Sequence, residues 1–175
     1  MQDQIATFTV FQHCRCIGGG CAGSSYEISR RALDRGGARV LIFDDRTGHT
    51  VEPQILLSLD PAQRGPGRPK LGVVAREVTL LPRHWDWLSA QPGGASVALR
   101  KLVEEARKAN AETDKIRNAR EAAYRFLAAI AADLTHYEEA LRALFAGDRE
   151  AFEFNTAKWP KKLRSYALNL AADGI

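Results

Sequence analysis

The sequence predicts an α+β protein that begins with strands, continues through a strand-helix-helix centre and ends in a helical bundle. Three observations predict this class. Short apolar runs bounded by glycine and turn residues are concentrated in the first 60 residues. One further alternating stretch lies in the middle of the chain. From residue 96 onward, apolar residues recur at steps of three and four, as they do on one face of a helix.

Residues 1–58 are expected to form a small ββαββ unit. The expected strands, rich in β-branched and aromatic residues, are Thr7–Phe11, Arg15–Ile17, Arg39–Phe43 and His49–Ile55. A helix is expected from Ser24 or Ser25 to about Arg35, because serine caps a helix start and Gly36-Gly37 ends it.

Two short motifs in this unit invite a functional interpretation, and both have a simpler one. Gly18-Gly19-Gly20 lacks the Gly-Lys-Ser/Thr ending of a phosphate-binding loop, so we expect a flexible turn. Asp44 and Asp45 follow a strand, but a third metal ligand is not apparent in the sequence. Aspartate is a common turn residue, and a turn is the better interpretation.

Residues 59–74 are expected to form an extended basic linker, because their prolines and glycines disfavour both helix and sheet. Gly67-Arg68-Pro69-Lys70 resembles the core of an AT-hook, an extended segment whose arginine enters a narrow A·T minor groove. Such a core has a second arginine directly before its glycine. Here Pro66 takes that place and the nearest arginine is Arg64, so a DNA contact and a plain basic linker both stay open.

Residues 75–110 are expected to form a strand and two helices. Ala75–Leu80 alternates between apolar and polar residues. Pro82 suits the first turn of a helix, because that turn needs no proline N–H. Ser96 follows a Gly-rich turn and suits the N-cap of the second helix. A unit this short cannot close a core of its own, so it is expected to need a partner.

This order of elements resembles the ribbon-helix-helix family, in which two chains pair their strands into one antiparallel ribbon. The matching parts are the strand Ala75–Leu80, the helix from Pro82 and the turn Gly94-Ala95-Ser96-Val97. The resemblance implies a homodimer whose ribbon enters the DNA major groove. It also implies a DNA phosphate at the start of the second helix, where free N–H groups and the helix dipole favour an anion.

The expected DNA-binding residues follow from this resemblance and from the linker. In the preferred register the strand turns Ala75, Glu77 and Thr79 outward, whereas a shift by one residue would turn Val78 and Leu80 toward solvent. A glutamate that faces DNA is unfavourable unless it accepts a hydrogen bond from a cytosine amino group, and the preferred register accepts this departure at Glu77. The full expected set is Arg64, Arg68, Lys70, Arg76, Glu77, Thr79, Arg83, Ser96 and Val97.

The whole chain resembles a bacterial family catalogued as domain of unknown function 2239. The residues that carry this resemblance are Gly67–Trp85, Gln91–Ser96, Leu144–Asp148 and Trp159-Pro160. The resemblance covers nearly the full length, but it implies no activity because the family has none assigned.

Positive charge is concentrated in the centre of the chain. The net charge of the 175 residues is +4. Residues 61–120 hold 12 basic and 6 acidic side chains, whereas each flank carries one net negative charge. A basic centre between nearly neutral flanks suits a polyanionic partner such as DNA, although a solvated basic surface would look the same.

Residues 111–175 are expected to form a helical region. The apolar stripe that starts at Ser96 predicts one long helix, or two helices joined near Asn110. Thr135-His136-Tyr137-Glu138 fits a capping box at the start of the next helix. Asp148, directly after Gly147, is expected to cap another, and Trp159-Pro160 precedes the last one.

The sequence predicts no enzyme, no catalytic residue, no cofactor and no metal. It contains neither a Gly-x-Ser-x-Gly elbow nor a His-Glu-x-x-His pair, and its four histidines are scattered. Cys14, Cys16 and Cys21 lie close together, but their spacing is not that of a usual zinc module. Whether these thiols have a redox or metal role stays open.

These observations favour a DNA-binding protein, a transcriptional regulator or nucleoid-associated protein that acts as a homodimer. The alternative is a non-catalytic protein–protein interaction module of antitoxin type, with a protein partner on the C-terminal helices. No apolar run is long enough to span a membrane and Met1–Gln4 does not resemble a secretory signal, so a cytoplasmic location is expected.

Overall fold

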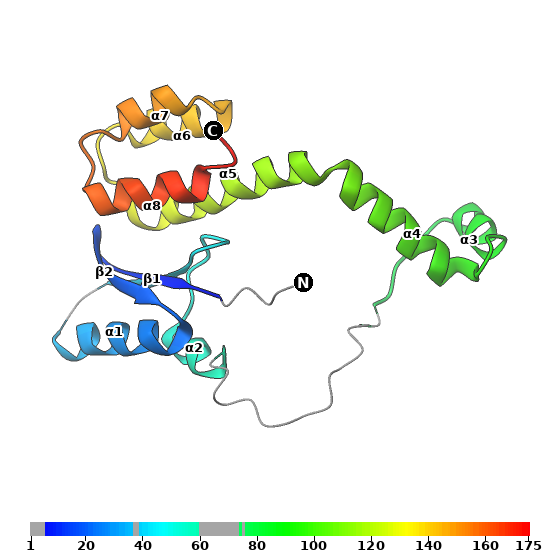
Figure 1. Ribbon diagram of the computed structural model, residues 1–175, viewed down its shortest axis with the longest axis horizontal. Coiled ribbons are helices and arrows are strands. Elements are labelled where there is room, and N and C mark those ends of the chain that lie inside the picture. The colour runs from blue at the N-terminus through cyan, green and yellow to red at the C-terminus, as the bar shows by residue number, and fades with distance from the viewer. Residues whose placement is uncertain (1–5, 37–38, 60–73, 75) are drawn as a thin grey trace. The chain divides into compact units, whose positions relative to one another are not determined.

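The computed structural model describes residues 6–36, 39–59, 74 and 76–175 (Figure 1). These residues form the α+β structure that the sequence predicts, with a three-stranded antiparallel sheet and a larger helical part. The chain divides into two compact units. The first comprises residues 1–64 and 115–175, and the second comprises residues 65–114.

The sheet of the first unit has the strand order β2-β1-β3. Its strands are β1 (Phe8–Gln12), β2 (Arg15–Gly20) and β3 (Val40–Asp44). Side chains alternate between the two faces of β1, so Phe8 and Val10 face one side and Phe11 faces the other. The first face is buried under α1 (Ala22–Asp34) and α2 (Pro53–Leu59), with Ile42 and Leu56 in the same cluster.

The other face of the sheet is buried under the C-terminal helices. These are α5 (Ala111–Ile130), α6 (Tyr137–Ala146), α7 (Arg149–Asn155) and α8 (Lys161–Ala171). Phe11 and Phe43 of the sheet contact Phe126 of α5, with ring centroids 5.2 and 4.9 Å from it. The sequence assigns residues 1–58 and 111–175 to separate regions, whereas the structure packs the sheet and most of the C-terminal helices around one core.

The expected ββαββ order is wrong at its last strand. Instead of a strand over His49–Ile55, Thr50 makes a single bridge to Phe43, and helix α2 begins at Pro53. Proline suits a helix start, and Leu56 gains complete burial from the helical turn. The three glycines Gly18–Gly20 also differ from expectation, because they belong to β2 instead of a flexible turn.

Several helix boundaries follow local signals that the sequence already carries. The Asp148 Oδ1 accepts the Ala151 N–H at 2.9 Å, which confirms Asp148 as the cap of α7. A break at Asn110 separates α5 from the preceding helix, so two helices form instead of one. The capping box at Thr135 is not formed: His136, with a φ of 62°, is the N-cap of α6. The Thr135 carbonyl instead accepts the Trp159 Nε1–H at 2.8 Å.

The described part of the second unit consists of an irregular segment followed by two helices. These are α3 (Pro82–Ser89) and α4 (Gly94–Ala109), which pack against each other. The helix from Pro82 is therefore confirmed. The second helix begins two residues before the expected cap Ser96, because Gly93 takes a left-handed conformation with a φ of 86° and serves as N-cap.

Residues 76–81 form no strand within this chain. A strand needs a hydrogen-bonded neighbour, and the expected neighbour is the same segment of a second copy. Ala75 lies outside the described residues, so the intersubunit ribbon stays a prediction.

Candidate nucleic-acid interface

The expected DNA-binding residues that the structure describes all lie in the second unit. Arg64, Arg68 and Lys70 lie outside the described residues. The others occupy three places: the irregular segment before α3, the first turn of α3 and the first turn of α4. They are Arg76, Glu77, Thr79, Arg83, Ser96 and Val97.

The polar residues of the segment before α3 are all exposed. Arg76, Glu77 and Thr79 reach solvent, as the preferred register expects. The apolar positions of that register behave differently from each other. Leu80 is half-buried and lines a groove on α3 and α4, whereas Val78 is 57% exposed. The inner face of the expected ribbon is therefore only partly covered by this chain.

Arg83 is exposed on the first turn of α3, directly after Pro82. The Leu81 carbonyl accepts the N–H groups of His84 and Trp85 at 2.8 and 3.3 Å, so the turn that carries Arg83 is well formed. Arg83 follows Thr79 by four residues in the chain. The sequence prediction that Arg83 flanks the segment is compatible with this placement.

At the start of α4 the expected phosphate contacts shift by one residue. The Gly94 N–H donates to the Gln91 carbonyl at 2.9 Å. In a helix whose N-cap is Gly93, the backbone N–H of Val97 is the first with a carbonyl partner four residues earlier. The N–H groups of Ala95 and Ser96 therefore have no such partner and suit an anion. Sequence reasoning missed Ala95 because it placed the cap at Ser96.

Further basic side chains extend along the exposed side of α4. Arg100 donates from Nε to the Ser96 carbonyl at 3.1 Å, which holds it near the helix start. Arg107 forms an ion pair with Glu104 at 2.7 Å, but both side chains are exposed, so this pair adds little stability. Lys101 lines a small groove with Trp87. Basic side chains thus extend along α4 instead of forming one compact patch, and acidic side chains such as Glu104 lie among them.

The second unit also exposes large apolar side chains, a feature that the sequence-based site did not include. Two grooves of about 260 and 190 Å³ lie on α3 and α4 and share Trp87 and Leu102. Trp87 is 53% exposed and Val103 54% exposed. The helical stripe of Leu99, Leu102 and Val103 was the available signal, but a stripe alone does not tell whether the same chain covers it.

The family assignment rests on nearly the whole chain. Residues 7–171 match the model of a family described as "Uncharacterized protein conserved in bacteria (DUF2239)". The chain belongs to the DUF2239 family. No curated protein and no solved structure matches it.

In this DUF2239 family member, the described residues offer no metal centre. No group of three or more histidine, cysteine, aspartate or glutamate side chains among them is placed to hold a metal ion. The three cysteines are thiols, and the Cys14 thiol lies 3.4 Å from the Ile130 carbonyl oxygen. Within the same described ranges, no helix has both the length and the apolar character needed to cross a membrane.

Proposed function

We propose that this protein binds duplex DNA as a homodimer through its second unit, as a transcriptional regulator or nucleoid-associated protein. The observation that carries the proposal is the exposed apolar surface of α3 and α4, in a unit that also carries the expected ribbon segment 76–80 and the unpartnered backbone N–H groups at the start of α4. DNA-binding units of the ribbon-helix-helix type combine the same features.

The dimer is the first step of the proposal. Among the described residues of the second unit, Leu88 and Ala98 are the buried apolar side chains. The burial of one leucine and one alanine is too small to stabilise a helix pair, because stability grows with buried apolar area. A second copy of the same chain is the partner that we expect to cover the exposed apolar surface of α3 and α4. Twofold symmetry would pair residues 76–80 antiparallel with themselves and bring the Trp87 and Leu102 grooves of both copies to one interface.

The DNA contact is the second step. In such a dimer, Glu77 and Thr79 would face the major groove from the ribbon, with Arg76 and Arg83 toward the phosphates on either side. The N–H groups at the start of α4 would hold one further phosphate. The excess of basic residues in residues 61–120 supplies the long-range attraction. An AT-hook-like contact by Arg64, Arg68 and Lys70 would add to it.

Fluorescence anisotropy with labelled A·T-rich and random duplexes tests the proposal directly. At about 50 mM salt the wild-type chain should bind both duplexes, and its log affinity should fall linearly with log salt. Arg76→Gln with Arg83→Gln should reduce the salt slope by about 0.9 for each lost phosphate contact. Arg142→Gln on α6 is the matched control, because this arginine is exposed in the first unit. Absence of wild-type binding at low salt would exclude the proposed function.

The antitoxin-type alternative draws on exposed aromatic side chains of the C-terminal helices. Phe154 on α7 is 81% exposed and Phe145 on α6 is 50% exposed. Because α5 and α8 share their core with the sheet, a fragment of residues 110–175 is not a suitable test and the full chain is needed. This alternative predicts no DNA binding, together with stoichiometric binding of a purified protein partner that Phe154→Ser weakens at least tenfold.

A further inference from the structure

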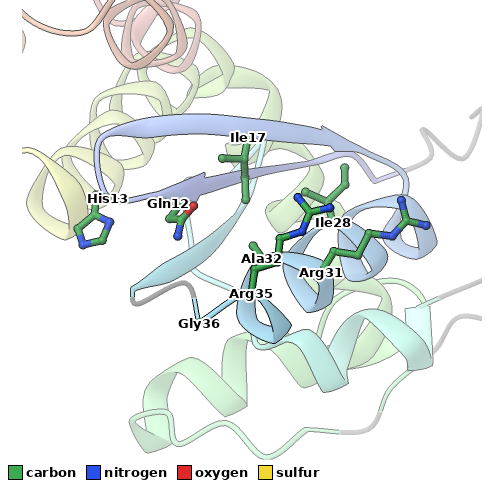
Figure 2. A pocket seen from close by; sticks show the side chains of 8 residues that line it. All are labelled: Gln12, His13, Ile17, Ile28, Arg31, Ala32, Arg35 and Gly36. Carbon is green, nitrogen blue, oxygen red and sulfur yellow. The ribbon is translucent and has the colours of Figure 1, made fainter.

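A hollow of about 590 Å³ lies between the β1–β2 hairpin and helix α1 in the first unit (Figure 2). Its volume falls in the range of about 300–1,000 Å³ that small-molecule sites occupy. It belongs entirely to the first unit and shares no residue with the candidate DNA interface. Any ligand that it binds is therefore a separate property of the protein.

One face of α1 forms a wall of this hollow. Ile28, Arg31, Ala32 and Arg35 follow the helical spacing i, i+3, i+4 and i+7, so all four project to the same side. Figure 2 shows their side chains on the side of α1 that faces the hairpin. Two apolar side chains and two guanidinium groups thus alternate along one wall.

The hairpin supplies the opposite wall. Ile17 comes from β2, and Gln12 and His13 come from the end of β1 and the turn after it (Figure 2). His13 has a φ of 51°, a left-handed conformation that histidine adopts more readily than most residues. Its N–H donates to the Arg39 carbonyl at 3.2 Å, which fixes the turn.

Ile28 of one wall and Ile17 of the other meet at the bottom of the hollow and form its apolar floor, which is anchored to the core of the unit. Ile17 and Ile28 are half-buried and pack against the cluster that contains Phe8 and Val10. Gly18 permits this packing, because a Cβ at that position would lie 2.8 Å from the Ile28 Cδ1. The floor is therefore fixed, whereas the guanidinium groups of Arg31 and Arg35 lie at the solvent rim.

The charges around the hollow leave the two arginines available to a ligand. Glu27 lies 3.9 Å from Arg31, but both side chains are at least half exposed, and such pairs contribute little. Arg30 and Asp34 pair at 3.8 Å and do not line the hollow. Cations near a helix C-terminus also interact favourably with the helix dipole. The two arginines alone would therefore not indicate a ligand-binding site. The volume and the anchored apolar floor beside them do.

We infer that this hollow binds a small organic anion. The apolar part of the ligand lies on Ile17, Ile28 and Ala32. Its carboxylate or phosphate group accepts hydrogen bonds from Arg31 and Arg35, whose planar guanidinium groups suit these anions. The Gln12 amide can donate a further hydrogen bond from the hairpin.

Calorimetry and two-dimensional amide NMR on the full chain test this inference with naphthoate as the probe. Naphthoate should bind and shift the amide signals of Gln12, Ile17, Ile28 and Gly36. Naphthamide, which has the same rings without the charge, should bind at least tenfold more weakly. Arg31→Gln with Arg35→Gln should weaken naphthoate binding at least tenfold. Arg30→Gln, the same change one residue away on the same helix, should stay within twofold of wild type.

Absence of naphthoate binding to the wild-type chain would overturn the inference, and so would three further results. One is equal binding of naphthoate and naphthamide, which would make the arginines irrelevant. Another is inorganic phosphate that binds as well as naphthoate, which would leave an anion-attracting surface without a role for the apolar floor. The third is a set of NMR shifts confined to the second unit. Because the three arginines are exposed, all variants should fold, and their thermal unfolding serves as the check.

Discussion

Tyr166 donates a hydrogen bond of 2.9 Å to the Asp45 carboxylate and so joins α8 to the turn after β3. The same oxygen accepts the Thr9 hydroxyl at 2.7 Å. The Tyr166 ring packs on Phe126 and Phe11, with centroids 4.7 and 5.4 Å away. Burial, and then the negative charge of Asp45, raise the pKa of the Tyr166 hydroxyl. This hydrogen bond joins the N-terminal and the C-terminal segments of the chain that together form the first unit.

Tyr166→Phe removes this hydrogen bond while it keeps the ring. We expect the free energy of unfolding to fall by about 1–2 kcal/mol, because the lost bond has a charged acceptor but Asp45 keeps Thr9 as a donor. Urea unfolding monitored by circular dichroism measures the change. Tyr124→Phe is the control, since Tyr124 is 43% exposed, and it should alter stability by less than about 0.5 kcal/mol. An equal effect of both changes would contradict a special role for the Tyr166 hydroxyl.

The same contact predicts a loss of stability at alkaline pH. A tyrosine in the unfolded chain loses its proton near pH 10, whereas the raised pKa keeps Tyr166 protonated in the folded chain. The contribution is therefore complete below about pH 10 and declines above it, because only the unfolded state then releases the proton. Tyr137, whose pKa is also raised by burial, adds to the decline. The stability difference between wild type and Tyr166→Phe should narrow from pH 8 to pH 11. Parallel curves would refute this account.

Gly48 provides a test of how closely the turn after β3 approaches α5. It has a φ of 65°, and a Cβ on it would overlap the Ala122 carbonyl group. We expect Gly48→Ala to cost about 2–4 kcal/mol, from backbone strain and overpacking together. Gly36 also has a positive φ, 75°, but a Cβ there would meet no atom within 4 Å. Gly36→Ala should therefore cost only about 1–2 kcal/mol, and the difference in urea midpoint isolates the contact with α5.

The proposed dimer predicts that a charge in the apolar surface of α4 separates the two copies. Leu102→Glu should convert a dimer into a monomer in light scattering at tens of micromolar, because burial of a carboxylate in an apolar interface is strongly unfavourable. Leu33→Glu is the matched control, since Leu33 is an exposed leucine of α1 in the first unit. A monomeric wild-type chain at this concentration would contradict the dimer and remove most of the basis for DNA binding.

Tryptophan fluorescence gives a second measure of the same dimer. Trp87 and Trp85 of the second unit are 53% and 39% exposed, whereas Trp159 of the first unit is buried. Dilution that separates a dimer should therefore shift the emission of Trp85 and Trp87 to longer wavelength. In Leu102→Glu the emission should already be shifted and independent of concentration. An unchanged spectrum on dilution of a wild-type dimer would exclude these tryptophans from its interface.

Thr79 offers a test of sequence readout that is separate from phosphate contacts. If its side chain reads a base edge, Thr79→Ala should reduce discrimination between preferred and non-preferred duplexes by about 1–3 kcal/mol. The salt slope should stay the same, because no phosphate contact is lost. Competition titrations with sequence-selected duplexes at two salt concentrations measure both quantities. A changed slope with unchanged discrimination would place Thr79 at the backbone.

Local sequence signals determined much of this structure. Pro82 marks the start of α3, Gly147 and Asp148 separate α6 from α7, and Asn110 separates α4 from α5. Each of these positions acts through its own backbone or through a side chain that bonds within one helical turn, as Asp148 does with the Ala151 N–H. A signal of this kind is complete within a few residues, so the sequence alone is sufficient to predict it.

Tertiary structure decided what the elements pack against. His49–Ile55 has the composition of a strand, yet burial of Leu56 against α1 favours a helix from Pro53. The apolar stripe of α5 predicts a buried face, but only the folded chain shows that Phe126 packs on Phe11 and Phe43 of the sheet. The hollow between Ile17 and Arg35 likewise exists only because α1 packs back on the β1–β2 hairpin, which the spacing of these residues does not show. Burial is non-directional, so a sequence pattern specifies that a face is apolar, and the packing of the whole chain selects its partner.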